Sequence, residues 1–394
     1  MEVSSGSGSP VQGSSAWPLL LTSVLALAAL YAPQPILPRW ADAYGLPETR
    51  VALVISVALI PLGVAPLAAG ALLRRVATTN LLRGASAVLA VAVGLTAVRP
   101  PFLLLLGLRV VQGTAIAALL TALMTHIAQS RQGAAMQRLM SAYVAATILG
   151  GFLGRLGAGL TASLASDAHF FAGLAGLLLV SDLGLQRLPV RAPTPRASSR
   201  SRPGVVDILQ RVPVVRIYAL VFCLFFVFSA FMNFLPFRLQ EVRPGASDAL
   251  AGALYAGYLV GVIASLGAQR VTAALPRPRT AMVLGSGGIL VALGIAMGPS
   301  VPVLFGAVAV LCATFFLAHA VAASRVNAAG NGDSDGTGRS LVNGLYVAVY
   351  YAGGVLGAYA PGFVYDAYGW RGFLGLLALL TVLGFGALFA PPWR

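Results

Sequence analysis

Long apolar runs, separated by short polar gaps, cover almost the whole chain. A helix needs about 20 mostly apolar residues to cross a bilayer, and each run is long enough to supply them. The runs are residues 17–37, 50–73, 80–98, 101–128, 137–162, 167–188, 216–238, 248–270, 279–298, 301–324, 340–362 and 370–390. This pattern predicts an all-α polytopic membrane protein with twelve transmembrane helices.

One long polar stretch, residues 189–215, interrupts the series of runs. Its segment VRAPTPRASSRSRPG is rich in Pro, Ser and Arg, a composition typical of disorder. We interpret 189–215 as a linker between an N-terminal six-helix half, 17–188, and a C-terminal six-helix half, 216–390. Residues 1–16 and 391–394 are then short tails. The first tail is Ser/Gly-rich and lacks the basic start of a cleaved signal peptide, so we expect the first run to stay as a span.

The composition agrees with lipid as the solvent for most of the chain. Hydrophobic residues make up 58% of the sequence and charged residues only 9%, against roughly a quarter charged in soluble domains. The formal net charge is +15, which by itself would allow nucleic-acid binding. The arginines lie in short gaps between apolar runs and not on one polar face, so we expect no nucleic-acid partner.

The arginines also indicate an orientation, because positive residues accumulate in cytoplasmic loops. With the N-terminus inside, eighteen arginines fall on the inner side and six on the outer side. The remaining two, Arg109 and Arg155, lie well inside runs, away from the run ends. We therefore expect a multi-pass protein of the inner (cytoplasmic) membrane with both termini in the cytoplasm.

The fifth runs of the two halves resemble each other. YVAATILGGFLGRLGAG (143–159) aligns with YVAVYYAGGVLGAYAPG (346–362), and the shared positions include three pairs of glycines. Those glycines are Gly150 with Gly353, Gly151 with Gly354, and Gly154 with Gly357. Glycines spaced by four lie on one helix face and let a partner helix approach closely, so we predict packing and gating roles for them. Arg155 aligns with Ala358, so the arginine is not needed for this packing.

Three local motifs resemble those of the major facilitator superfamily. LRVVQGTAIAAL (108–119) is similar to the fourth-helix motif Arg-x-x-Gln-Gly, with Arg109, Gln112 and Gly113 at its positions. GGFLGRLGAG is similar to the fifth-helix antiporter motif, with Arg155 in place of the proline.

The third motif departs further from the family pattern. GALLRRVATTN (70–80) stands where the family has Gly-x-x-x-Asp-Arg-x-Gly-Arg-Arg, and only Gly70 and Arg75 match. Arg74 replaces the acid and Ala77 the glycine, which puts the family's usual cytoplasmic charge latch in doubt. The resemblance covers about 17–390, and further short elements look like the bacterial sugar and drug efflux branch. It implies two repeated six-helix halves, alternating access and a small-molecule substrate.

A charge inside a span is costly, so Arg109 and Arg155 are candidate functional residues. The functional interpretation is a cationic patch that lines an outward cavity, pairs with a polar or anionic substrate and tunes a proton step. The alternative is a structural arginine that caps backbone carbonyls beside the Gly-rich helix. The motif match favours function for Arg109, and the two interpretations are evenly balanced for Arg155.

Neutral groups complete the candidate substrate and proton-coupling site. His319 lies within a span and can titrate near neutral pH, although a histidine that is simply hydrogen-bonded in the bundle is the stronger alternative. Neutral hydrogen-bonding side chains within runs, each of which could equally belong to the core, are Gln34, Gln112, Asn233, Tyr31, Tyr143, Tyr255, Tyr258, Tyr346, Tyr350 and Tyr351.

The middle of every run lacks Asp and Glu. Cation exporters usually exchange a proton for the cation at a buried acid, so this absence favours a neutral or anionic substrate. We find no Walker loop, metal cluster or catalytic constellation, and expect neither enzyme activity, cofactor nor metal site. The sequence thus predicts a monomeric, proton-coupled exporter. An importer of the same fold and a non-transporting membrane sensor or scaffold are the alternatives.

Overall fold

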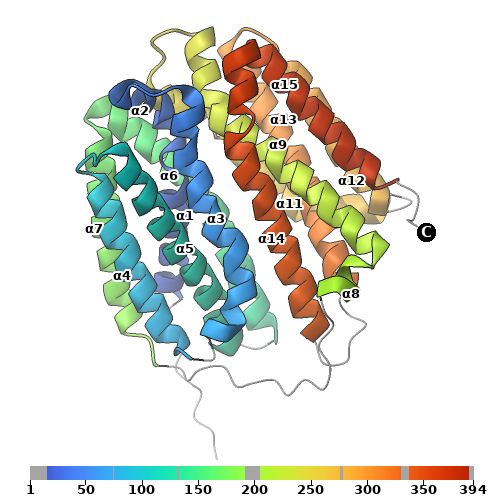
Figure 1. The fold of residues 1–394 in the computed structure, drawn as a ribbon. Helices are drawn as coiled ribbons and strands as arrows, with labels where there is room; N and C mark the ends of the chain where they lie inside the picture. Colours follow the sequence, from blue (N-terminus) through green and yellow to red (C-terminus); the bar gives the residue numbers. More distant parts are fainter. Residues whose placement is uncertain are drawn as a thin grey trace, which may run out of the picture.

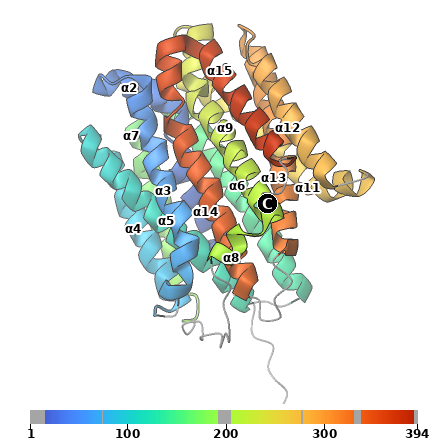
Figure 2. The same ribbon diagram turned by 45° about the vertical axis from the view of Figure 1, so that its right-hand side comes forward.

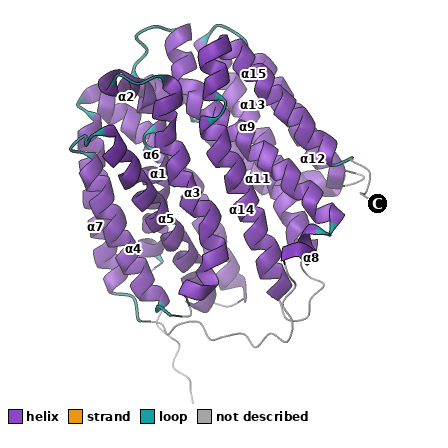
Figure 3. Ribbon diagram, in the orientation of Figure 1, coloured by secondary structure: helices purple, strands orange, loops and turns teal. Residues whose placement is uncertain are grey.

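The computed structural model describes residues 16–73, 75–130, 133–190, 205–275, 278–329 and 337–389. Within these ranges the chain is helical and contains no strand (Figure 3). Eleven helices are long and apolar enough to cross a membrane, and a shorter apolar helix spans Thr280–Ile295. These helices correspond to the twelve predicted runs and confirm the expected all-α membrane architecture.

The helices form two bundles that stand side by side (Figure 1). The N-terminal bundle contains α1 (Trp17–Tyr31), η1 (Gln34–Ile36), α2 (Leu37–Tyr44), α3 (Glu48–Leu72), α4 (Thr78–Thr96), α5 (Phe102–Ser130), α6 (Gly133–Leu164) and α7 (Asp167–Gln186). The C-terminal bundle contains α9 (Val212–Val242), α10 (Asp248–Leu254), α11 (Gly257–Ala274), α12 (Pro278–Ile295), α13 (Val301–Ala329), α14 (Thr337–Tyr359) and α15 (Gly362–Ala387). The short helix α8 (Val205–Leu209) packs on α9.

The two most extensive contacts between the bundles are those of α3 with α14 and of α6 with α10. Figure 2 shows α3 and α14 adjacent again after a 45° turn. The helix α2 lies at one end of the molecule and α8 at the other (Figure 1). We call these the α2 end and the α8 end.

The glycines of the fifth span in each half pack as the sequence repeat suggests. A Cβ on Gly150 would lie 2.2 Å from the carbonyl oxygen of Val24, and one on Gly154 would lie 2.5 Å from the Cα of Ala28. These distances are too short for any side chain, so α6 and α1 meet backbone to backbone.

The C-terminal half repeats this arrangement between α14 and α9. A Cβ on Gly353 would lie 2.2 Å from the carbonyl oxygen of Phe222, and one on Gly357 would lie 2.1 Å from that of Phe226. The neighbouring Gly354 makes room for the ring of Phe225. The pair α6 and α1 in the N-terminal half and the pair α14 and α9 in the C-terminal half are therefore packed in the same way, through glycines.

Three spans differ from the predicted runs. The first is interrupted at residues 32–36, where Pro33 and Pro35 lack the N–H that a continuous helix would need. The run 248–270 is split at Tyr255 and Ala256 into α10 and α11. The last helix begins at Gly362 and not at residue 370, and it turns sharply at Gly369, where φ is +63° and favours glycine.

Residues 191–204 of the predicted linker 189–215 lie outside the described residues, and its remainder includes α8 and the start of α9. The two predicted tails also fall outside them, apart from Ala16 at the start of α1.

Candidate functional site

Arg155 lies fully buried on α6, where that helix meets the C-terminal half. Its Nε donates to Gln34 Oε1 at 2.6 Å, and Nη1 donates to the carbonyl of Gly151 at 2.7 Å. Its Nη2 donates across the interface to the hydroxyl of Tyr258 at 3.0 Å. One guanidinium thus connects the interrupted end of α1, its own helix and α11.

Three tyrosine rings surround the same guanidinium. Its central carbon lies 4.2 Å from the ring centroid of Tyr31, 4.9 Å from that of Tyr255 and 4.5 Å from that of Tyr258. Cation–π contacts of this kind stabilise a desolvated charge. Among the described residues no carboxylate forms an ion pair with Arg155. Its positive charge is therefore solvated by neutral dipoles and ring faces alone.

Gln34 and Asn233 meet at the centre of the interface between the halves. Gln34 Nε2 donates to Asn233 Oδ1 at 3.5 Å, and both side chains are buried. The Asn233 amide also donates to the carbonyl of Ala358 at 2.8 Å. Three of the predicted substrate-site residues, Gln34, Arg155 and Asn233, are therefore brought together in one hydrogen-bonded chain that crosses the two halves.

Arg109 has a different environment, inside the N-terminal half. It is fully buried and donates to the carbonyl oxygens of Val54 and Ala29 at 2.9 and 3.0 Å. It also donates to the carbonyl of Leu30 and, at 2.6 Å, to Gln112 Oε1. Arg109 shares no side-chain partner with Arg155. The geometry favours the carbonyl-capping alternative for Arg109 over the cavity lining that the motif suggested.

Gln112 and Gly113 belong to the same packing arrangement. Gln112 donates to the carbonyl of Ala92 and to the hydroxyl of Thr96, both at 2.9 Å, and so connects α5 to α4. A Cβ on Gly113 would lie 2.2 Å from the carbonyl oxygen of Ala58, which places α5 directly against α3. The fourth-helix motif thus ties α1, α3, α4 and α5 together.

The structure places the loop motif away from this site. Gly70 lies near the end of α3. Arg75 is exposed in the turn that follows α3 at the α8 end.

His319 and Tyr350 lie in an aromatic cluster of the C-terminal half. The ring centroids of His319 and Tyr350 are 4.8 Å apart, and His319 Nδ1 lies 3.0 Å from the hydroxyl of Tyr346. Tyr350 stacks on Phe225 at 3.9 Å. Both His319 and Tyr350 are half-buried. The structure thus joins these two predicted residues to each other, on the opposite half from Arg155.

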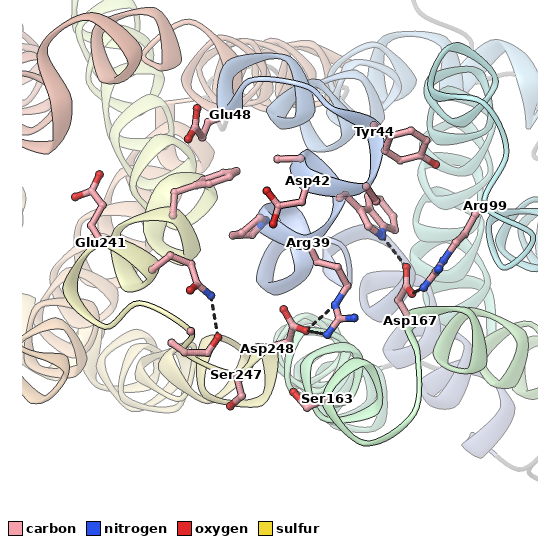
Figure 4. A pocket seen from close by; sticks show the side chains of 18 of the residues that line it. Arg39, Asp42, Tyr44, Glu48, Arg99, Ser163, Asp167, Glu241, Ser247 and Asp248 are labelled. Carbon is pink, nitrogen blue, oxygen red and sulfur yellow. Dashed lines mark hydrogen bonds and ion pairs between the residues drawn. The ribbon is translucent and has the colours of Figure 1, made fainter.

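A pocket of about 1300 Å³ opens at the α2 end between the halves (Figure 4). We call it the vestibule. Five of the eleven acidic residues of the chain line it, together with two arginines. The charged lining residues are Asp42, Glu48, Asp167, Glu241, Asp248, Arg39 and Arg99. The vestibule is therefore net negative in a protein whose overall charge is strongly positive.

Both arginines of the vestibule form ion pairs. Arg39 donates to Asp248 from Nε at 2.8 Å and from Nη2, which joins α2 to α10 across the halves (Figure 4). Arg99 pairs with Asp167, whose other oxygen accepts from Trp40 Nε1 at 2.7 Å. The first pair connects the two halves, and the second connects the loop between α4 and α5 to α7 within the N-terminal half.

The floor of the vestibule is formed by α6 and α10. The backbone N–H of Ala249 donates to the hydroxyl of Ser163 at 2.9 Å. One turn before Ser163 on α6, a Cβ on Gly159 would lie 2.2 Å from the carbonyl oxygen of Asp248. On α10, a Cβ on Gly252 would lie 2.7 Å from the carbonyl oxygen of Arg155. The helices α6 and α10 therefore meet backbone to backbone next to the lining of the vestibule.

Sequence reasoning missed the vestibule. Its acidic residues are distributed over four parts of the sequence, and only the packing of α2, α3, α7, α9 and α10 brings them together. The available signal was their placement, because all five lie in a gap or at the first residue of a run, on the side of the membrane assigned to the exterior.

Comparisons with known proteins agree with this architecture. A family model described as Major Facilitator Superfamily matches residues 19–333. The chain is 23% identical over 364 residues to the uncharacterized MFS-type transporter YybF of Bacillus subtilis, covering 90% of this chain and 88% of that one. It is 24% identical over 370 residues to the inner membrane transport protein YnfM of Escherichia coli, covering 93% of this chain and 87% of that one.

Two solved structures share the fold. The nucleoside transporter NupG, as a D323A mutant, superposes with a TM-score of 0.77 at 12% identity, covering 95% of this chain and 100% of that one. A bacterial homologue of the human lysosomal transporter Spinster, inward-facing and occupied, gives a TM-score of 0.74 at 13% identity and covers 95% of each chain. The family match extends over most of the residues that build the two halves. The chain therefore belongs to the major facilitator superfamily of transporters.

Proposed function

We propose that this transporter exports a small neutral or anionic organic compound across the cytoplasmic membrane in exchange for protons. The observation that carries the proposal is Arg155, a buried positive charge at the interface of the halves with no carboxylate partner among the described residues. A buried charge without a counter-ion is unfavourable. An anionic or strongly hydrogen-bonding cargo would supply the missing partner.

The position of Arg155 also suits alternating access, in which two halves rock about a site near the middle of the membrane. Its hydrogen bond to Tyr258 connects the halves, and at Gly159 and Gly252 the helices α6 and α10 meet backbone to backbone. A cargo that competes for the donors of Arg155 would weaken the connection and favour rearrangement of the halves.

We place the α2 end on the outer side of the membrane and both termini in the cytoplasm. The arginine distribution supports this orientation through the positive-inside rule. In that orientation the α6–α10 floor closes the outer side. The negative vestibule beyond it would disfavour the return of an anion, which favours export over import.

His319 is our candidate for proton coupling. An imidazole can bind and release a proton, and this one lies within a span, half-buried beside the Tyr346 hydroxyl. The alternative, a histidine that only packs within the aromatic cluster, predicts export that does not depend on this side chain.

The test is metabolite profiling of cells that carry the wild type, Arg155→Gln or Gly176→Ala, with and without a protonophore. A Cβ on Gly176 would meet nothing within 4 Å, so that variant is a matched control. We expect one anionic or neutral compound to leave cells with the wild type and the control, and to be retained with Arg155→Gln or the protonophore. Export that is unchanged in Arg155→Gln at equal protein levels would contradict the proposal.

Uptake of a compound from the medium would support the importer alternative. Absence of any transport in the wild type, across both medium compounds and a toxin panel, would support the non-transporting sensor.

A further inference from the structure

The aromatic cluster of the C-terminal half continues without a gap from His319 to the rings around Arg155. Phe315 stacks on His319 at 5.8 Å and on Phe228 at 3.9 Å between ring centroids. Phe228 then meets Tyr258 at 5.7 Å, and Tyr258 accepts the hydrogen bond from Arg155. A guanidinium thus lies at one end of a surface built from aromatic rings, which we call the aromatic wall.

Part of the aromatic wall is uncovered. Phe316, His319 and Tyr350 are half-buried, whereas Phe225 and Phe315 behind them are buried. Phe316 stands against Tyr258 at 5.8 Å, and Tyr350 stands against His319 at 4.8 Å. The buried rings therefore support the accessible ones in fixed orientations, as expected of a surface that receives a flat ligand.

The N-terminal half faces the aromatic wall with Tyr31. The ring of Tyr31 and the ring of Tyr258, which belongs to the aromatic wall, cover the same guanidinium, with centroids 4.2 and 4.5 Å from its central carbon. The ring of Tyr31 is also the nearest of the three that cover Arg155. Rings from both halves therefore gather around one guanidinium at the interface between the halves.

We propose that the cargo is an aromatic carboxylate, with its anionic group at Arg155 and its ring against Phe316 and Tyr350. This inference rests on the proposed function and narrows its substrate class. A carboxylate accepts the planar donors of a guanidinium bidentately, and a flat ring pairs with aromatic faces at offset or edge-on geometry. A saturated acid would keep the first interaction and lose the second.

The test measures binding of three probes to the purified full chain in detergent by titration calorimetry. The probes are 2-naphthoate, its saturated analogue decahydro-2-naphthoate, and the neutral 2-naphthamide. We expect naphthoate to bind about three- to tenfold more tightly than the saturated acid, the range that an aromatic pair contributes beyond its buried area.

Variants separate the two interactions. Tyr350→Leu should remove the preference for naphthoate over the saturated acid. Arg155→Gln should weaken both acids and leave naphthamide unchanged. The control is Phe385→Leu on α15, which removes a half-buried ring that contacts the ring of Phe389. It should bind all three probes as the wild type does. Thermal unfolding of each purified variant verifies that it is folded, and Phe316→Leu replaces Tyr350→Leu if that variant is not.

Equal binding of the two acids, a preference that survives both Tyr350→Leu and Phe316→Leu, or no binding of any probe would overturn the aromatic inference. The proposed function would still stand if both acids bind through Arg155, or if the compound found by metabolite profiling is a non-aromatic anion. If Arg155→Gln binds both acids as tightly as the wild type does, that result would count against both proposals.

Discussion

Replacement of Gly154 by alanine tests the close packing that holds α6, and therefore Arg155, in place. The new Cβ would lie 2.5 Å from the Cα and the carbonyl oxygen of Ala28, whereas ordinary contacts begin at 3.4 Å. The two helices must separate by about 0.9 Å, because the obstacle is backbone and cannot rotate away. Overpacking of this kind lowers the free energy of unfolding by about 1–3 kcal/mol. The higher helix propensity of alanine offsets at most about 1 kcal/mol of that loss.

Gly176→Ala on α7 is the matched control, because its Cβ would meet nothing within 4 Å. We expect Gly154→Ala to lower the midpoint of thermal unfolding of the purified protein and Gly176→Ala to leave it equal or slightly higher. Export should fall in Gly154→Ala, because Arg155 is the next residue on the displaced helix. Equal unfolding midpoints for the two variants would refute the reasoning that α6 and α1 pack backbone to backbone.

Two further predictions concern the vestibule and proton coupling. Asp248→Asn should loosen the α2 end, because it removes the charge that pairs with Arg39 across the halves. Arg39 is 41% exposed, so the pair contributes at most about 1 kcal/mol and labelling of a cysteine placed at Ser163 should rise no more than about fivefold. Equal labelling in both backgrounds would contradict this connection. His319→Gln should leave the protein folded but make export independent of the proton gradient, measured as efflux across a range of external pH. An unchanged pH profile would assign His319 to packing alone.

Hydropathy predicts the twelve spans because burial in lipid requires about 20 apolar residues in each helix. It cannot predict where a span breaks when the run stays apolar throughout. The run 248–270 is an example, because its break at Tyr255 coincides with a hydrogen bond from the Tyr255 hydroxyl to the carbonyl of Met232, 23 residues away. That bond depends on tertiary packing, which hydropathy does not record.

For the candidate site, the sequence likewise identifies the residues but not the contacts that they make. A charge in a span singles out Arg109 and Arg155 equally, since both are costly there. Only the structure separates them, because backbone carbonyls enclose Arg109 whereas side chains from both halves surround Arg155. The glycine repeat was visible in the sequence because spacing by four fixes one helix face regardless of tertiary context.

The most direct test of the central claim is the export rate of the profiled compound from proteoliposomes that contain the wild type, Arg155→Gln or Arg155→Lys at equal protein density. Arg155 is the buried charge that the cargo is proposed to meet, and a hydrogen bond to a charged group contributes about 1.5–3 kcal/mol. We predict that Arg155→Gln lowers the rate by about tenfold or more and that Arg155→Lys, which keeps the charge, retains part of it. A rate for Arg155→Gln equal to that of the wild type would contradict the account.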